Sequence, residues 1–326
     1  MTTGCGPAAL QEKTVDGVPM RILVAIDGSD SANLAVDLVA DVAWPGGTTI
    51  RVVEAIETGA ALFGDPWPTL ALVQADELEA QLRLGANVTV QEAQARLTRP
   101  GLTVESEVLR GRPAGALVDD ARRMAADLIV VGSRGYGTIE SMLLGSVSAE
   151  VIDRAMTPVL VARHQRIDRV VLAWDGSTSA SRAAEVLRRW PIFARSSVRV
   201  VSVADIEVPW WSGFPEAGSP ELSPLWLDAM DASRSHRDQL ASAMTVELEA
   251  AGITAEMDRR EGDAATEILA AANAFEADLI LLGTHGRTGV VRLVLGSVAR
   301  NVLHHASCSV LVVRETPAEA DPRSDA

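Results

Sequence analysis

An internal duplication is the feature that most constrains the fold of this chain. Residues 21–38, RILVAIDGSDSANLAVDL, return about 150 residues later as RVVLAWDGSTSASRAAEVL at 169–187. The stretch 126–152 returns in the same way at 277–303. A repeat of this length is too long for a solenoid unit and suits a whole domain. The sequence therefore predicts one domain at 20–163, a second at 168–314, and tails at 1–19 and 315–326.

Short apolar runs alternate with helical patterns inside each copy. In the first copy we expect strands at 21–26, 49–56, 102–111, 127–131 and 158–163, and helices at 31–43, 70–98, 113–126 and 146–155. In the second copy we expect strands near 168–174, 197–204, 253–260, 278–282 and 309–313. Such alternation implies parallel strands joined by right-handed helical crossovers. Each copy is therefore predicted to be a doubly wound α/β domain.

Composition narrows the classes of function. The formal charge is −15 and the pI is about 4.8, so general binding to nucleic acid or to anionic membranes is not expected. No apolar run reaches the roughly 18 residues of a membrane span. The N-terminal stretch lacks the basic and apolar regions of a signal peptide, and two cysteines cannot form a disulfide framework. We expect a cytoplasmic protein.

A spaced glycine pattern occurs once in each copy. It reads Gly132-x2-Gly135-x9-Gly145-Ser146 in the first copy, and 283–297 repeats the same spacing. Each pattern directly follows an apolar strand, and each Gly-Ser pair opens a predicted helix. The first two glycines are expected to adopt positive φ and to let the backbone approach a ligand. The Gly-Ser pair brings free N–H groups, a hydroxyl and a helix N-terminus together, which predicts an anion site.

These motifs resemble those of the universal stress protein family, with two such domains covering about residues 20–315. The G-x2-G-x9-G-S/T pattern is the ATP-binding signature of that family. The Asp-Gly-Ser that follows each opening strand and the closing Val-Leu-Val strand also agree. The resemblance implies a five-stranded parallel sheet in each domain, with strand order 3-2-1-4-5. It also implies ATP, accompanied by Mg²⁺, across the carboxyl ends of strands one and four.

The resemblance also assigns residues to the two expected sites. Aspartates should lie near the ribose and adenine, alanines two positions earlier should line the same edge, and the ends of the second strands should meet adenine through backbone groups. The glycine loops should hold the phosphates, with two arginines as partners. Apart from the resemblance, one histidine is expected in contact because it lies inside the second glycine loop. In the first copy the residues are Ala25, Asp27, Ala55, Gly132, Arg134, Gly135, Gly145, Ser146 and Val147. In the second copy they are Ala173, Asp175, Val203, Gly283, His285, Gly286, Arg287, Gly296, Ser297 and Val298.

The same motifs admit structural interpretations. The glycines can form tight strand-to-helix turns with Ser146 and Ser297 as plain N-caps, and Asp27 and Asp175 can be turn residues. His304 and His305 suit a helix C-terminus, where positive charge is favoured. Cys308 suits a buried core position. Aromatic residues in 208–226 can pack on their own domain, form a lid, or bind a partner.

No catalytic machinery is evident in the sequence. The G-x4-G-K-[ST] pattern of P-loop NTPases is absent, and Lys13 is the only lysine. No serine triad or metal-ligand spacing appears, so no catalytic or metal residue is assigned. We expect an ATP-binding regulatory stress-response protein, with at most weak ATPase activity or autophosphorylation. A slow ATP hydrolase or adenine-nucleotide transferase is one alternative, and a nucleotide-independent interaction module is another.

The closing strands carry an expectation about assembly. The segments at 158–163 and 309–314 are apolar and lie at a sheet edge in the family's strand order. Open apolar edges tend to pair with other strands. The resemblance implies that these two edges pair antiparallel across a pseudo-two-fold axis, here within one chain, and a homodimer through other surfaces stays possible.

Overall fold

The computed structural model describes residues 17–57, 69–135, 144–204, 235, 238–284 and 295–314, with side chains in the long helix 69–97 described from residue 77 onward. The first lobe contains, in chain order, β1 (Arg21–Ala25), α1 (Asp30–Asp41), β2 (Thr49–Ile56), α3 (Thr69–Leu97), β3 (Thr103–Arg110), α4 (Pro113–Arg123), β4 (Leu128–Gly132), α5 (Ser146–Arg154) and β5 (Val159–Ala162).

The second lobe repeats this order. It contains β6 (Arg169–Ala173), α6 (Thr178–Arg189), a 3₁₀ turn η1 (Pro191–Phe193), β7 (Ser197–Ala204), β8 (Ala255–Glu261), α8 (Ala264–Phe275), β9 (Leu279–Gly283), α9 (Ser297–His305) and β10 (Ser309–Val313). Residues 238–250 are helical as well and precede β8. Each of the ten strands lies within two residues of its expected bounds.

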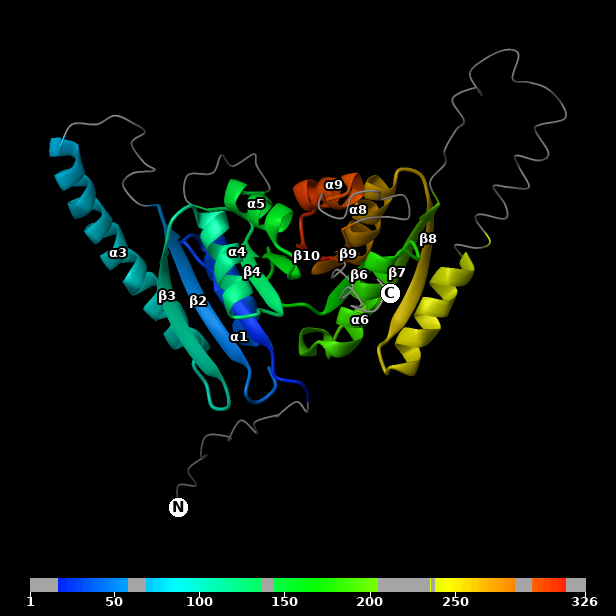
Figure 1. The fold of residues 1–326 in the computed structure, drawn as a ribbon. Coiled ribbons are helices and arrows are strands. Elements are labelled where there is room, and N and C mark those ends of the chain that lie inside the picture. Colours follow the sequence, from blue (N-terminus) through cyan, green and yellow to red (C-terminus); the bar gives the residue numbers. More distant parts are fainter. Residues whose placement is uncertain are drawn as a thin grey trace, which may run out of the picture.

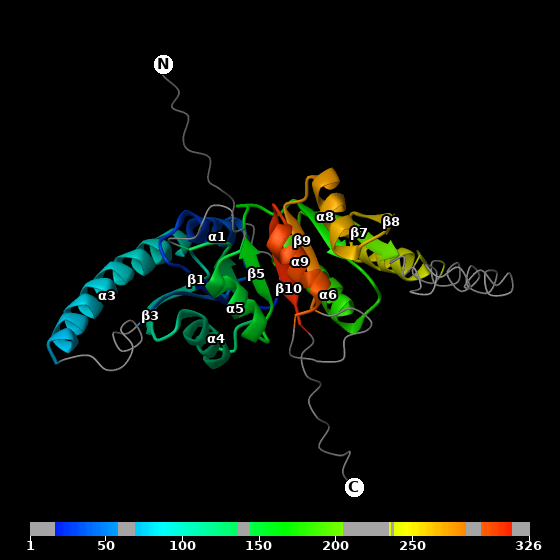
Figure 2. The ribbon, with the colours of Figure 1, turned by 90° about the horizontal axis from the view of Figure 1, so that it is seen from above.

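All ten strands form one sheet in the order β3-β2-β1-β4-β5-β10-β9-β6-β7-β8. Each lobe thus has the expected five-stranded parallel order 3-2-1-4-5. The expected edge pairing is confirmed, because β5 and β10 pair antiparallel at the centre of the sheet. In the register Leu160 lies opposite Leu311, its own counterpart in the repeat, as a pseudo-two-fold axis requires. Figure 1 shows the lobes on either side of this junction, and Figure 2 shows it from above.

Helices cover both faces of the sheet. One face is covered by α1, α3, α6 and 238–250, and the other by α4, α5, α8 and α9. The central strands are apolar on both faces for this reason. Strand β4 is buried at every position, whereas the outer strand β3 alternates between exposed and half-buried residues. The carboxyl ends of β1 and β4 therefore lie between two helical layers, at the point where the strand order reverses.

Candidate functional site

A pocket of about 270 Å³ opens at the carboxyl ends of β1 and β4 in the first lobe. Ligands of open α/β sheets bind at such a reversal point. All nine residues predicted for the first site line this pocket. They are Ala25, Asp27, Ala55, Gly132, Arg134, Gly135, Gly145, Ser146 and Val147.

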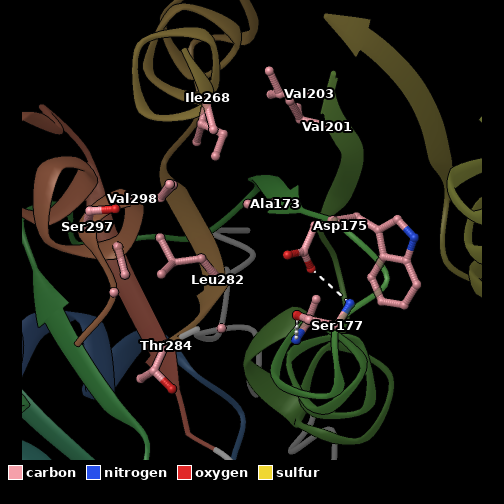
Figure 3. A pocket seen from close by; sticks show the side chains of 16 residues that line it. Ala173, Asp175, Ser177, Val201, Val203, Ile268, Leu282, Thr284, Ser297 and Val298 are labelled. Carbon is pink, nitrogen blue, oxygen red and sulfur yellow. Dashed lines mark hydrogen bonds between the residues drawn. The ribbon is translucent and has the colours of Figure 1, made fainter. Parts of the chain in front are cut away.

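An equivalent pocket of about 240 Å³ lies in the second lobe. Figure 3 shows Asp175 on one side of it, Ser297 and Val298 on the opposite side, and Ile268 and Val203 beyond them. The predicted residues that line it are Ala173, Asp175, Val203, Gly283, Gly296, Ser297 and Val298. The remaining three predictions, His285, Gly286 and Arg287, lie outside the described residues.

Each aspartate braces the turn that opens its pocket. Asp27 Oδ1 accepts a hydrogen bond from the Ser29 backbone N–H at 3.0 Å, and Asp175 Oδ1 accepts one from Ser177 at 2.9 Å. Both serines then cap the following helix, since their side chains accept from the backbone N–H three residues on. The aspartates thus have the structural role of turn residues, and their carboxylates also line the pockets.

The glycines of the loop are required by close packing. A Cβ on Gly132 would lie 2.7 Å from the Ser31 carbonyl carbon, and one on Gly135 would lie 2.5 Å from Asp27 Oδ2. Gly283 is equally confined, with the Ser179 carbonyl carbon 2.7 Å from its Cβ position. The expected positive φ is wrong for these three glycines, because none of them adopts it. Glycine is needed at Gly132 and Gly283 because the ends of β4 and β9 contact the starts of α1 and α6.

The Gly-Ser pairs form helix N-termini that face the pockets. Gly145 and Gly296 are the N-caps of α5 and α9, and neither cap makes a side-chain hydrogen bond. The interpretation of Ser146 and Ser297 as plain N-caps is therefore wrong, since they are the first helical residues. Both serines are exposed. Each helix thus presents its positive end and an exposed hydroxyl to the pocket, which suits an anion.

The glycine loop of the first lobe is fastened to helix α1. The Ser31 hydroxyl accepts from the Arg134 backbone N–H at 3.1 Å and donates to the Arg134 carbonyl, and Ser29 Oγ donates to the same carbonyl at 3.2 Å. The far end of the loop is closed where the Gly145 N–H donates to the Ser133 carbonyl at 2.7 Å. Gly296 and Thr284 make the equivalent bond, at 2.8 Å, in the second lobe. The backbone at both ends of each loop is therefore held in place.

Several lining residues were missed by the sequence analysis. Helix α4 contributes Pro113 and Leu117 to the first pocket, and α8 contributes Ala264 and Ile268 to the second. These side chains give each pocket an apolar wall beyond the ends of the second strands. The regular position of the helix after the third strand was visible in both repeats, and could have suggested that it covers the site.

The two lobes differ beside the pockets, on the side of α1 and α6. Ile26 and Glu54 of the first lobe correspond in the repeat to Trp174 and Ser202 of the second. Burial raises the pKa of Glu54, and the charge of Asp27 raises it further, while a hydrogen bond from Thr89 acts against both. Glu54 Oε2 and Trp174 Nε1 are both buried without a hydrogen-bond partner among the described residues. On this side of its sheet, the first lobe thus has a buried carboxyl oxygen and the second lobe a buried indole N–H.

Three other residues singled out from the sequence, His304, His305 and Cys308, do not line either pocket. His304 and His305 end α9, and His305 Nδ1 lies 2.8 Å from the Asn301 carbonyl, as their structural interpretation predicts. Cys308 is buried, and burial raises the pKa of its thiol to about 11. The aromatic segment 208–226 lies outside the described residues. Within the described part of the chain, no three metal-binding side chains come together, and no helix has the length and hydropathy of a membrane span.

Comparison with known proteins agrees with this geometry. The family model described as "Universal stress protein family" matches twice, at residues 20–163 and 166–314. A universal stress protein of Mycobacterium tuberculosis is 27% identical over 319 residues, covering 90% of this chain and 95% of its own. One from Thermus aquaticus is 37% identical over 142 residues, 44% of this chain and 97% of its own.

A solved structure supports the arrangement of both lobes. The crystal structure of a universal stress protein from Archaeoglobus fulgidus superposes with a TM-score of 0.62 at 19% identity, covering 91% of this chain and 98% of that one. At that identity the likeness shows the fold alone. Because the family model matches both repeats, this chain belongs to the universal stress protein family as a tandem of two such domains.

Proposed function

We propose that this protein is an ATP-binding regulator of a stress response, with one adenine-nucleotide site in each lobe. One observation carries the proposal. All sixteen described residues that the family signature assigns to binding gather around two equivalent pockets at the strand-order reversal.

The residues fit the parts of a nucleotide. The apolar wall formed by Ala25, Ala55 and Leu117 suits the adenine, and Asp27 suits the ribose hydroxyls as an acceptor. The N-terminus of α5 with Ser146 suits the phosphates, with the exposed Arg134 beside them. Mg²⁺ would arrive bound to the nucleotide and neutralise part of its phosphate charge. The side chains that correspond in the second lobe are Ala173, Val203, Ile268, Asp175 and Ser297.

Binding rather than turnover is the activity we propose. No general base is assigned among the described residues. The carboxylates of Asp27 and Asp175 each accept a backbone N–H of their own turn, and His285 lies outside the described residues. ATP hydrolysis or nucleotide transfer remains the alternative, and it is tested by incubating the protein with Mg²⁺ and ATP and following phosphate release.

The two sites can be removed one at a time. Ser146→Asp and Ser297→Asp each place a negative charge at an exposed helix N-terminus, where it repels phosphate and leaves the fold intact. Calorimetry with Mg²⁺ and ATP should give two nucleotides per chain for the unchanged protein, one for each single variant, and none for the double variant. Glu150→Gln, at an exposed position further along α5, is the matched control and should still bind two. Unchanged stoichiometry in both serine variants would refute the proposed sites.

A further inference from the structure

A further cavity lies between the lobes, away from both proposed nucleotide sites. It measures about 580 Å³ and is lined by five parts of the chain: the residues before β1, the segment before β4, the segment before β5, one side of α6, and the end of β10. Val18 at its edge is 79% exposed. The nucleotide proposal assigns no role to this cavity.

The pseudo-two-fold axis relates this cavity to the linker between the lobes. On the linker side, the chain leaves β5 at Arg163 and runs past α1 to β6. His164 N–H donates to Ser309 Oγ at 3.1 Å, Gln165 Nε2 donates to Asp37 Oδ2 at 3.0 Å, and Arg166 Nε lies 3.7 Å from Asp41 Oδ2. A short polar segment therefore joins α1 to the neighbouring lobe on that side.

On the cavity side, the corresponding chain leaves β10 at Arg314. This arginine corresponds to Arg163, and its guanidinium makes the corresponding kind of contact, donating to the Ile152 and Asp153 carbonyls at 2.7 and 2.9 Å. Residues after Arg314 correspond to the linker, and those before β1 correspond to the residues before β6. The cavity lies beside α6, between the end of β10 and the start of β1. The linker occupies the equivalent place beside α1, on the other side of the axis.

The charges of the two sides are reversed. Helix α1 presents the acidic Asp37 and Asp41 to the linker, and the linker itself contains the basic Arg166. Helix α6 presents Arg182 and Arg189 to the cavity, and both share one acid, Glu185, at 3.9 and 2.8 Å. Their side chains are 47% and 71% exposed. The residues that follow Arg314 are acidic, since residues 315–321 read ETPAEAD.

From this symmetry and charge reversal we propose that the cavity is the docking site of the acidic segment directly after Arg314, residues 315–319. The segment crosses from β10 toward the start of β1 as the linker crosses from β5 toward β6. Glu315 and Glu319 then face the arginines of α6, and the lobes are joined on both sides of the axis. This inference is independent of nucleotide binding.

Hydrogen exchange of the full chain, read by mass spectrometry, tests the proposal. Amides of 315–319 should exchange at least about tenfold more slowly than an unstructured peptide of the same sequence. Arg182→Glu with Arg189→Glu should remove this protection, because both arginines are exposed enough for charge reversal without unfolding. Adding Glu315→Arg and Glu319→Arg to that pair should restore it. The matched control, Arg83→Glu with Arg122→Glu on exposed helical surface of the first lobe, should leave it unchanged.

Three results would overturn the proposal. The first is exchange of 315–319 at the unstructured rate in the unchanged protein. The second is protection that survives reversal of both cavity arginines. The third is loss of protection in residues 1–16 instead, or protection that depends on protein concentration, since these would assign the cavity to the other end of this chain or to a second copy.

Discussion

Glu54 lies in an environment that is unfavourable to its charge. It lies on the α1 and α3 side of β2, half-buried, with Oε2 lacking a hydrogen-bond partner among the described residues. Burial and the negative charge of Asp27 both raise the pKa of this carboxyl above 4.5. The ionised form therefore costs free energy in the folded protein that it does not cost in the unfolded chain.

Replacing Glu54 with glutamine should stabilise the protein at neutral pH. The cost of the charge is fully present above the folded pKa and vanishes below about 4.5, where the carboxyl is protonated in both states. Because the group is only half-buried, the gain should be small, a rise in Tm of about 1–2 °C at pH 7.5. Thermal unfolding across pH 4 to 8 measures it. Glu57→Gln, at an exposed position just beyond β2, is the control and should show no such pH-dependent gain.

The fourth strand of each lobe ends in glycine because the end of that strand contacts a helix. Strand β4 ends at Gly132 directly against the first turn of α1, and β9 ends at Gly283 against the first turn of α6. Any side chain there would push helix and strand apart. Ser148 Oγ reinforces the junction in the first lobe by donating to the Gly132 carbonyl at 2.7 Å. The pocket opens at this junction, so its shape depends on the same contact.

Gly132→Ala should therefore destabilise the protein by about 1–3 kcal/mol, because a Cβ would meet backbone atoms of α1 that cannot move independently. Gly85→Ala provides the opposite control. Gly85 lies within α3 with nothing within 4 Å of its Cβ position, so alanine there should stabilise by about 0.5–1 kcal/mol. Denaturant unfolding measures both. A Gly132→Ala protein as stable as the parent would contradict the packing explanation.

At the scale of the whole molecule, two arginines connect the lobes beside the β5–β10 pair. Arg163 of the first lobe donates to the Leu303 and Cys308 carbonyls of the second, at 2.8 and 3.1 Å. Arg314 of the second lobe donates to carbonyls at the end of α5 in the first. Each guanidinium thus lies at the negative end of a helix in the other lobe. Burial lowers the pKa of Arg163 to about 10, which leaves it charged at neutral pH.

Removing these arginines should weaken the connection between the lobes. Arg163→Met and Arg314→Met each leave buried carbonyls without a donor, which costs about 1–3 kcal/mol per site. The double variant should unfold at lower temperature, with the single calorimetric transition broadened or split as the lobes lose their coupling. Arg122→Met, at an exposed position on α4, should change stability by less than about 0.5 kcal/mol.

The sequence by itself determined the duplication, the order of strands and helices, and sixteen of the residues that line the two pockets. These follow from local periodicity, from the spacing of Gly132, Gly135 and Gly145, and from a family signature present twice. Whether those pockets hold nucleotide stays a prediction. Edge pairing of β5 and β10 was also expected, because the family resemblance implies it and because open apolar edges tend to pair with other strands.

Only the tertiary structure decided the rest, because it depends on contacts between residues distant in sequence. It showed that Gly132 is required by its contact with the backbone of α1, that Gly135 lies against the Asp27 carboxylate, and that neither glycine adopts positive φ. It also placed Leu117 and Ile268 over the pockets. Arg163 and Arg314 read as ordinary residues after a strand, and only the packing of one lobe on the other gives each of them a helix end to bind.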